Sequence, residues 1–140
     1  MRTAAITAAQ TTAGLQKWVY DAGAMQWKFA YTRQSGLNLG QPYSVAGCPA
    51  GSNSVTGLRN LMGRVERDGT MTIWAITSTV SGNDDVGADP NRLVAVRDVL
   101  KSTSAMTAAH EQCPVLRTAK FAEVLRGIEF APGTETGRSH

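Results

Sequence analysis

A run of acidic and amide side chains between residues 81 and 91 is the part of the chain best suited to chemistry. Its oxygen donors lie close together in sequence, and Gly82 and Gly87 permit the sharp turns that a wrapped ion needs. Calcium takes about six to eight oxygen ligands, and carboxylates, side-chain amides and loop carbonyls supply them. Aspartate and asparagine also favour simple solvated turns, which is the alternative reading. The sequence therefore predicts a calcium site whose side-chain ligands are Asn83, Asp84, Asp85 and Asp89.

The same loop contributes to a candidate catalytic set. Paired carboxylates cleave glycosides, and a histidine exchanges protons near neutral pH. No serine stands in a Gly-x-Ser-x-Gly setting, which disfavours a hydrolase triad, and each carboxylate is also suited to a solvated surface. If the protein is a small hydrolase of glycosides or esters, we expect its catalytic residues to be Asp84, Asp89, His110 and Glu123.

Aromatic side chains and two arginines are the candidate ligand-binding residues. We expect four aromatic residues, Trp18, Trp27, Tyr31 and Trp74, to pack in the core or between sheets, with an exposed stacking platform for a sugar ring as the alternative. Tyr43, in a long loop, is expected to be the most exposed aromatic residue. Arg59 and Arg126 occupy matching places in a weak internal repeat, in which Leu-Arg-Asn and Leu-Arg-Gly each precede an apolar segment. An arginine there can clamp an anionic ligand or cap loop carbonyls.

Composition points to a single β domain over residues 1–140. Charged residues make up only 18% of the chain, and its 14 glycines suit many tight turns better than a helical bundle. The net charge of +3 is spread along the chain without a dense basic run, so nucleic acid is not an expected partner. No apolar run is long enough to span a membrane, and the N-terminal residues are too polar for a secretory signal.

The two cysteines do not form a metal-binding or redox motif. Cys48 and Cys113 are far apart in sequence, and each precedes a proline, which places both in loops or at strand ends. We expect two separate thiols. One long-range disulfide is the alternative in an oxidising compartment.

Two β-hairpins are the clearest structural prediction. Residues 15–20 and 25–31 alternate apolar and polar side chains around a short turn, so Trp18 and Tyr20 should pair across the hairpin with Trp27, Phe29 and Tyr31, which share one face. A second hairpin is predicted over residues 59–79. Its Asp68-Gly69 pair suits a two-residue type I′ turn.

The rest of the chain is expected to alternate loops and short strands. We predict a long loop over 34–57, strands over 93–97, 115–118 and 122–131, and a short helix or irregular crossover within 100–113. Residues 1–13 are expected to be a flexible or strand-donating arm, and residues 133–140 a polar tail.

Several stretches between residues 15 and 132 resemble bacterial secreted β-propeller proteins. They include Trp18-Val-Tyr20, Gly57-Leu-Arg-Asn60, the segments 68–79 and 87–96, and Leu125-Arg-Gly-Ile-Glu-Phe-Ala-Pro132. The resemblance implies antiparallel four-stranded sheets arranged radially and a secreted or periplasmic location, with functions that are mostly unassigned. The chain supplies about two blades, whereas about four to eight close a propeller. We therefore expect a homo-oligomer that completes the ring, or else a small β-barrel or sandwich.

The predicted function is a non-catalytic binding or assembly module of the propeller type, for carbohydrate or a cell-surface partner. It rests on the aromatic strands, the long loops and the lack of a catalytic constellation. The alternatives are the small hydrolase described above, with or without calcium, and a structural piece of a longer propeller.

Overall fold

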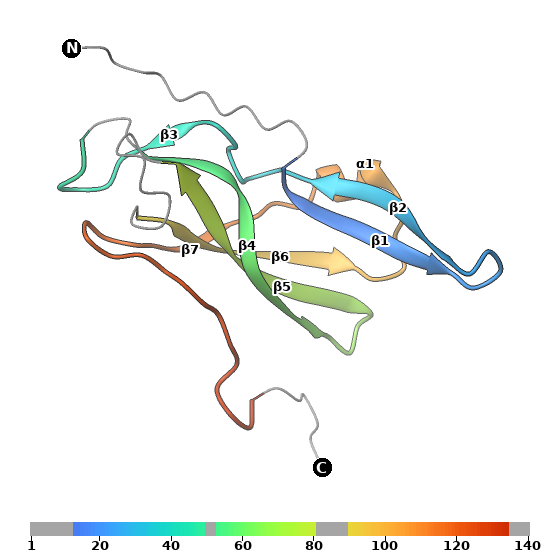
Figure 1. The fold of residues 1–140 in the computed structure, drawn as a ribbon. Helices are drawn as coiled ribbons and strands as arrows, with labels where there is room; N and C mark the ends of the chain where they lie inside the picture. The colour runs from blue at the N-terminus through green and yellow to red at the C-terminus, as the bar shows by residue number, and fades with distance from the viewer. Residues whose placement is uncertain (1–12, 50–52, 81–89, 135–140) are drawn as a thin grey trace.

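A computed structural model of the chain describes residues 13–49, 53–80 and 90–134. Within these ranges the chain forms seven β-strands and one short α-helix, which confirms the prediction of an all-β protein. The strands make two antiparallel sheets, a five-stranded sheet and a two-stranded ribbon (Figure 1). The sheets do not close into a barrel, and the propeller arrangement remains a prediction.

The five-stranded sheet is a meander, because neighbouring strands follow one another in the chain. In spatial order its strands are β3 (Pro42–Tyr43), β4 (Asn53–Val65), β5 (Thr70–Val80), β6 (Arg92–Val99) and β7 (Val115–Thr118). The helix α1 (Ala105–Ala109) lies between β6 and β7 in sequence and packs against the second strand of the ribbon. The long loop predicted over 34–57 is shorter than expected, because it contains β3 and ends where β4 begins.

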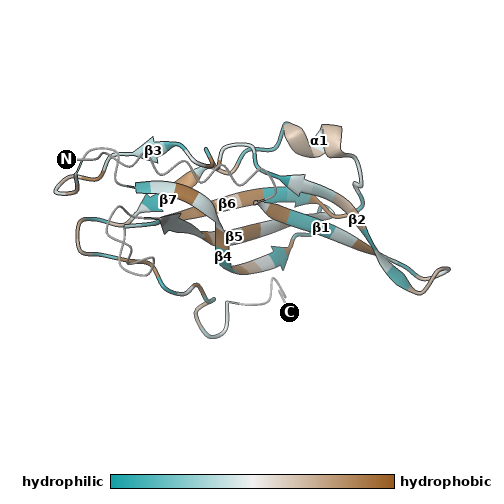
Figure 2. Ribbon diagram, turned by 45° about the horizontal axis from the view of Figure 1, so that its top comes forward, coloured by the Kyte–Doolittle hydropathy of each residue, from teal (hydrophilic) through white to brown (hydrophobic). Residues whose placement is uncertain are grey.

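Small and β-branched side chains on the five-stranded sheet form the core. Apolar and polar residues alternate along the strands, as the bands of colour in Figure 2 show, so one face of each strand is available for packing. Ala75 of β5 lies directly opposite Val94 of β6, and both are buried. The buried residues form a larger cluster, Leu37, Ala75, Val94, Val96 and Cys113, and a smaller one, Tyr43, Val45 and Val55.

The ribbon consists of β1 (Leu15–Asp21) and β2 (Gln26–Arg33), which confirms the first predicted hairpin. Its turn is held by the carboxylate of Asp21, which accepts hydrogen bonds from the backbone N–H groups of Gly23 (2.9 Å) and Ala24 (3.1 Å). The base of the ribbon lies against the five-stranded sheet, and its far end extends beyond that sheet (Figure 1).

The β4–β5 hairpin is present, but its predicted two-residue type I′ turn is wrong. That turn needs positive φ at both central residues, and here only Gly69 has it (φ 80°). The N–H of Gly69 donates to the carbonyl of Glu66, and the N–H of Glu66 donates to the carbonyl of Thr70. The connection is therefore a three-residue loop with glycine at its left-handed position.

The strand predicted over 122–131 is also wrong, because this segment forms no ladder with the sheet. Its backbone is held by side chains instead. The Leu125 N–H donates to Oδ1 of Asn91 (2.7 Å), and Nδ2 of Asn91 donates to the Leu125 carbonyl (2.8 Å). Further along, the ring of Phe130 meets that of Trp74 edge to face, with 5.5 Å between centroids. The segment thus lies along the sheet without extending it.

Candidate binding surface on the β1–β2 ribbon

Four aromatic side chains occupy one face of the ribbon. Trp18 lies opposite Phe29, and Tyr20 lies opposite Trp27. The ring centroids are 5.3 Å apart in the first pair and 5.5 Å apart in the second, with interplanar angles of 65° and 61°. This edge-to-face geometry confirms the predicted pairing for Trp27 and Phe29, whereas Tyr31 lies opposite Lys17 and does not join it. We call these four residues the aromatic face.

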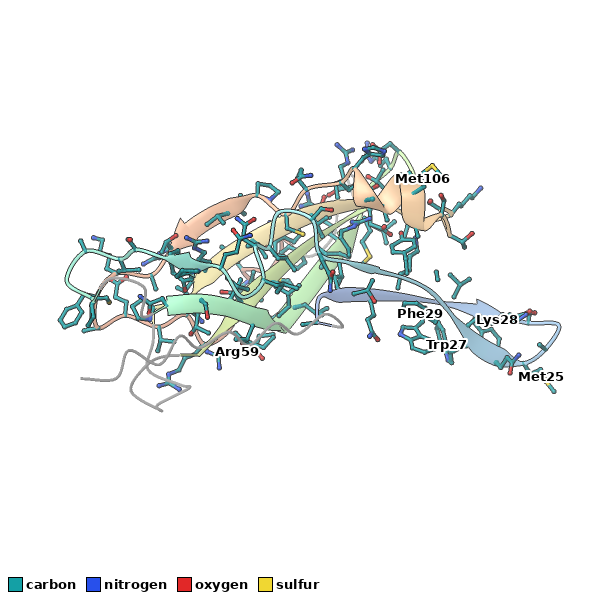
Figure 3. The ribbon with its side chains drawn as sticks, turned by 90° about the horizontal axis from the view of Figure 1, so that it is seen from above. Met25, Trp27, Lys28, Phe29, Arg59 and Met106 are labelled. Atoms are coloured by element: carbon teal, nitrogen blue, oxygen red, sulfur yellow. The ribbon has the colours of Figure 1, made fainter. Side chains whose placement is uncertain are left out.

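The aromatic face is open to solvent. Its four residues are between 49% and 65% exposed, and Met25 in the turn beyond them is 79% exposed. Figure 3 shows Met25, Trp27 and Phe29 on the projecting end of the ribbon. The prediction that Trp18 and Trp27 pack between sheets is therefore wrong. The ribbon extends past the five-stranded sheet, so no second layer among the described residues covers these side chains.

A buried cluster of charged groups fixes the base of the ribbon to β6. Asp98 of β6 accepts a hydrogen bond from the Tyr31 hydroxyl (2.6 Å) at Oδ1 and one from the Lys17 ammonium (2.8 Å) at Oδ2. Lys17 also donates to the Val99 carbonyl (2.8 Å). Because hydrogen bonds to charged groups in poorly solvated surroundings are strong, these contacts join β1 and β2 to the same strand.

Arg33 completes this cluster from the end of β2. Its side chain is 1% exposed, and its Nη2 lies 2.8 Å from Oδ1 of Asp98. The same nitrogen pairs with Glu111, which follows α1 in the chain. A buried guanidinium needs such partners, since an uncompensated buried charge is strongly unfavourable. The ribbon is therefore tied to both β6 and the segment after α1, and its aromatic face is held at a defined angle.

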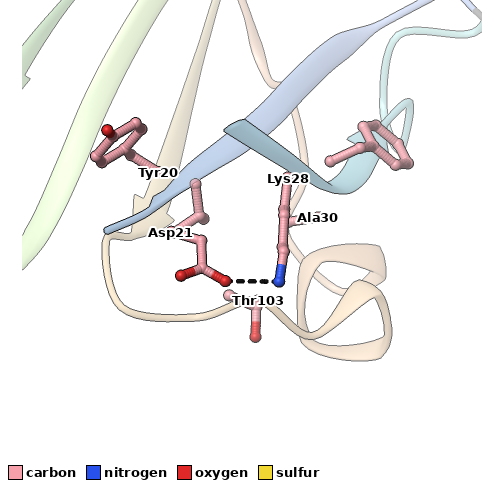
Figure 4. Close-up of a pocket in the computed structure, with 7 residues that line it drawn as sticks. Tyr20, Asp21, Lys28, Ala30 and Thr103 are labelled. Atoms are coloured by element: carbon pink, nitrogen blue, oxygen red, sulfur yellow. Dashed lines mark ion pairs between the residues drawn. The ribbon is translucent and has the colours of Figure 1, made fainter. Parts of the chain in front are cut away.

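The opposite face of the ribbon carries Val19 and Ala30 beside a pair of charged residues and borders an open pocket of about 460 Å³. Lys28 and Asp21 form an ion pair there (2.6 Å), with Thr103 nearby (Figure 4). This contact with Lys28, followed by the hydrogen bond from the Ala24 N–H, lowers the pKa of Asp21 below its ordinary value. The two faces of the ribbon thus differ, with four aromatic rings on one and an ion pair among small apolar residues on the other.

The predicted calcium ligands Asn83, Asp84, Asp85 and Asp89 lie outside the described residues, and so do two of the predicted catalytic residues. Within the described ranges, no group of three or more histidine, cysteine, aspartate or glutamate side chains is placed to hold a metal ion. The calcium site therefore stays a prediction.

The other two predicted catalytic residues are in different surroundings. His110 is exposed at the C-terminal end of α1. Glu123 accepts a hydrogen bond from the Lys120 N–H (3.0 Å) and lies 3.5 Å from Arg117. These contacts, the backbone hydrogen bond first, lower the pKa of Glu123. No hydrogen bond or ion pair within the described ranges joins His110 to Glu123.

Tyr43 is buried, so the prediction that it is the most exposed aromatic residue is wrong. Its hydroxyl donates to the carbonyl of Pro90 (2.6 Å), and the guanidinium of Arg92 lies 3.6 Å from its ring centroid. Tyr43 belongs to β3 and to the smaller core cluster, which explains its burial.

Arg59 and Arg126, the two arginines of the weak internal repeat, belong to segments that contact each other. The side-chain amide of Asn60, next to Arg59, donates to the backbone carbonyl of Arg126. Arg126 is exposed, whereas Arg59 is partly buried. The structure thus brings the two segments together. The hydrogen bond that joins them is made by the Asn60 side chain and the Arg126 backbone carbonyl.

Both cysteines are free thiols, as predicted. Cys113 is buried in the larger core cluster, and burial raises the pKa of its thiol, although the charge of Arg33 opposes that rise. Cys48 is partly exposed. Across the described ranges, we find no helix with the length and apolar character needed to cross a membrane.

Comparison of the chain with protein-family profiles, with curated proteins and with solved structures gave no match. Its candidate function must therefore be argued from the site.

Of the predicted site residues, only Trp27 belongs to the aromatic face. For Trp18 the sequence predicts stacking only as the alternative to packing between sheets, and Tyr20, Phe29 and Met25 were not predicted as binding residues. Their signal in the sequence is the alternation on both strands of one hairpin, which places all four rings on a single face.

Proposed function

We propose that the protein is a non-catalytic binding module and that the aromatic face is its binding surface. The observation that carries this proposal is a set of four half-exposed rings on a ribbon whose base is fixed by buried charges. Aromatic residues are enriched where proteins bind one another, because they bury a large area and lose little conformational entropy.

The size of this surface supports a binding role. A fully buried aromatic side chain contributes about 150–250 Å², so four half-exposed rings present roughly 300–500 Å². The largest apolar patch on a monomeric protein is commonly about 300–600 Å², and it is often functional. Leaving such a surface in water is unfavourable, and covering it on binding gains free energy in proportion to the area covered.

The fixed base of the ribbon supports the same role. A flexible hairpin loses conformational freedom when it binds, whereas one already held by Asp98 and Arg33 loses less. The ligand class that fits is an apolar surface, which includes the apolar face of a sugar ring and a protein surface.

The test is a matched pair of substitutions, Trp27→Ser on the aromatic face and Phe121→Ser elsewhere. The two side chains are similarly exposed, at 65% and 61%. Binding is measured by affinity electrophoresis in soluble polysaccharides and by sedimentation of the protein alone. We expect Trp27→Ser to weaken any retention or self-association, and Phe121→Ser to leave it unchanged. Equal behaviour of both variants and the unsubstituted protein would overturn the proposal.

A further inference from the structure

We infer that the partner of the aromatic face is a second copy of this chain, packed face to face in a symmetric dimer. This inference rests on the proposed function and names the ligand of the same surface. A symmetric dimer is the commonest protein assembly, and it requires one surface that is complementary to itself.

The orientation of the rings favours a protein partner over a sugar. A sugar ring stacks on an aromatic ring that presents its flat face. Here the rings of each pair are inclined by 65° and 61°, so the two rings of a pair do not form one continuous flat platform and the surface is ridged. Ridged surfaces suit side chains that interdigitate, as the facing layers of a β-sandwich do.

The positions of the large and small rings make the aromatic face complementary to itself. Trp18 and Trp27 stand at one pair of diagonal corners, and Tyr20 and Phe29 stand at the other. Suppose that the two-fold axis lies in the plane of contact and runs either parallel or perpendicular to the strands. Each indole then faces one of the smaller rings, Tyr20 or Phe29, of the second copy. Facing layers pack without voids when large residues meet small ones in this way.

The tip and the base of the ribbon favour an axis across the strands. With that axis the ribbons run in opposite directions, and the tip of each lies toward the base of the other. Met25 at the tip is strongly exposed. At the base, a pocket of about 240 Å³ lies between the ribbon and the sheet, and its lining combines the apolar Leu15, Met71 and Leu100 with the charged groups of the base. A flexible methionine is suited to the apolar part of this pocket.

Area and charge are both consistent with a reversible dimer. Two aromatic faces together bury roughly 600–1,000 Å², and the two methionine contacts add to this. Specific interfaces bury about 1,200–2,000 Å², so the contact lies below that range, where association is weak and transient. Two chains of net charge +3 repel each other, but none of the four residues of the aromatic face is charged. We therefore expect a dissociation constant in the micromolar range.

The experiment is sedimentation equilibrium of the full chain from low micromolar to several hundred micromolar concentration. Four variants are compared in two matched pairs, Trp27→Ser with Phe121→Ser, and Met25→Gln with Met106→Gln. The two methionines are almost equally exposed, at 79% and 78%. We expect a monomer–dimer equilibrium in which the two ribbon variants raise the dissociation constant about tenfold or more, and the two control variants do not. Far-ultraviolet circular dichroism verifies that each variant is folded.

Two outcomes separate this inference from the proposed function. A protein that remains monomeric, yet binds a polysaccharide through Trp27, overturns the dimer and keeps the binding module. A protein that remains monomeric and shows no binding that depends on Trp27 overturns both. A dimer that is unaffected by Trp27→Ser also overturns the inference, because it must form through another surface.

Discussion

The hydroxyl of Tyr31 donates a 2.6 Å hydrogen bond to the carboxylate of Asp98, which lies 67 residues further along the chain. Tyr31 belongs to β2, whose far end carries half of the aromatic face, and Asp98 belongs to β6 of the five-stranded sheet. The same carboxylate pairs with Lys17 and Arg33. Three side chains at the base of the ribbon therefore converge on one buried acid, which helps to set the direction in which the aromatic face points.

Asp98→Asn is expected to destabilise the protein by about 1.5–3 kcal/mol, because Arg33 loses its charged partner on β6 and keeps only Glu111 as a charged partner. Asp68→Asn is the control, since Asp68 pairs with Arg97 on the surface and exposed pairs contribute little. Urea unfolding followed by circular dichroism measures both. Equal stability of the two variants would show that the charge cluster does not hold the ribbon.

Gly36→Ala tests the packing of the segment that leads from the ribbon into the core. Gly36 has φ 81°, and an added Cβ would lie 2.7 Å from the backbone nitrogen of Cys113. We expect a loss of more than about 1 kcal/mol from the strained backbone and the clash. Gly127→Ala is the control, because its Cβ would meet nothing within 4 Å. If both variants unfold at the same urea concentration, the close approach of Gly36 to Cys113 is incorrect.

The two thiols should react with a disulfide reagent at different rates. Cys48 is partly exposed, whereas Cys113 is buried and its pKa is raised by that burial, so little of it is thiolate at neutral pH. We expect one fast reaction per chain, which Cys48→Ser removes, and a second that requires unfolding. Two fast reactions in the native protein would contradict the burial of Cys113.

Stability should fall in acid. Hydrogen bonds from Arg64 and then Thr72 lower the pKa of Glu66, and the hydroxyl and N–H of Thr70 lower that of Asp68. A carboxyl group with a lower pKa in the folded chain stabilises the protein fully above its ordinary pKa, which is 4.5 for Glu66 and 3.8 for Asp68. This stabilisation is lost as the pH falls through the lower folded value.

The measurement is the urea midpoint at about pH 7, 5 and 3, which span the pH range in which these carboxyl groups are protonated. We expect the midpoint to change little between the first two values and to fall at the third. Glu66→Gln should reduce the fall, whereas the exposed Glu129→Gln should not. A midpoint that rises in acid would contradict the assigned directions.

The sequence was sufficient to predict the strands whose pattern is local. The alternation in residues 15–31 gave the ribbon and its cross-strand pairs, and the β-branched run in 93–97 gave β6. The segment 122–131 shows where this reasoning fails. It has a strand-like composition, but its backbone bonds to the side chain of Asn91, a distant partner that no local pattern reveals.

The exposure of the aromatic residues was not predictable, because it depends on where the ribbon lies relative to the larger sheet. Trp74 and Trp27 both occur in alternating strands, yet Trp74 meets Phe130 and Trp27 projects beyond the sheet. The contacts that decide this difference join Lys17, Tyr31 and Arg33 to Asp98, across more than 60 residues of chain. Such long-range ion pairs leave no periodic signal in a sequence.

The most direct test of the binding surface is the NMR signal of the three indole N–H groups, recorded as the protein is diluted. Trp18 and Trp27 lie on the aromatic face. Trp74 is an internal control, because its ring contacts Arg64 and Phe130 away from that face. We predict that the resonances of Trp18 and Trp27 shift with concentration and that the resonance of Trp74 does not. Three resonances that stay constant on dilution and on addition of polysaccharide, or a shift confined to Trp74, would contradict a binding role for the aromatic face.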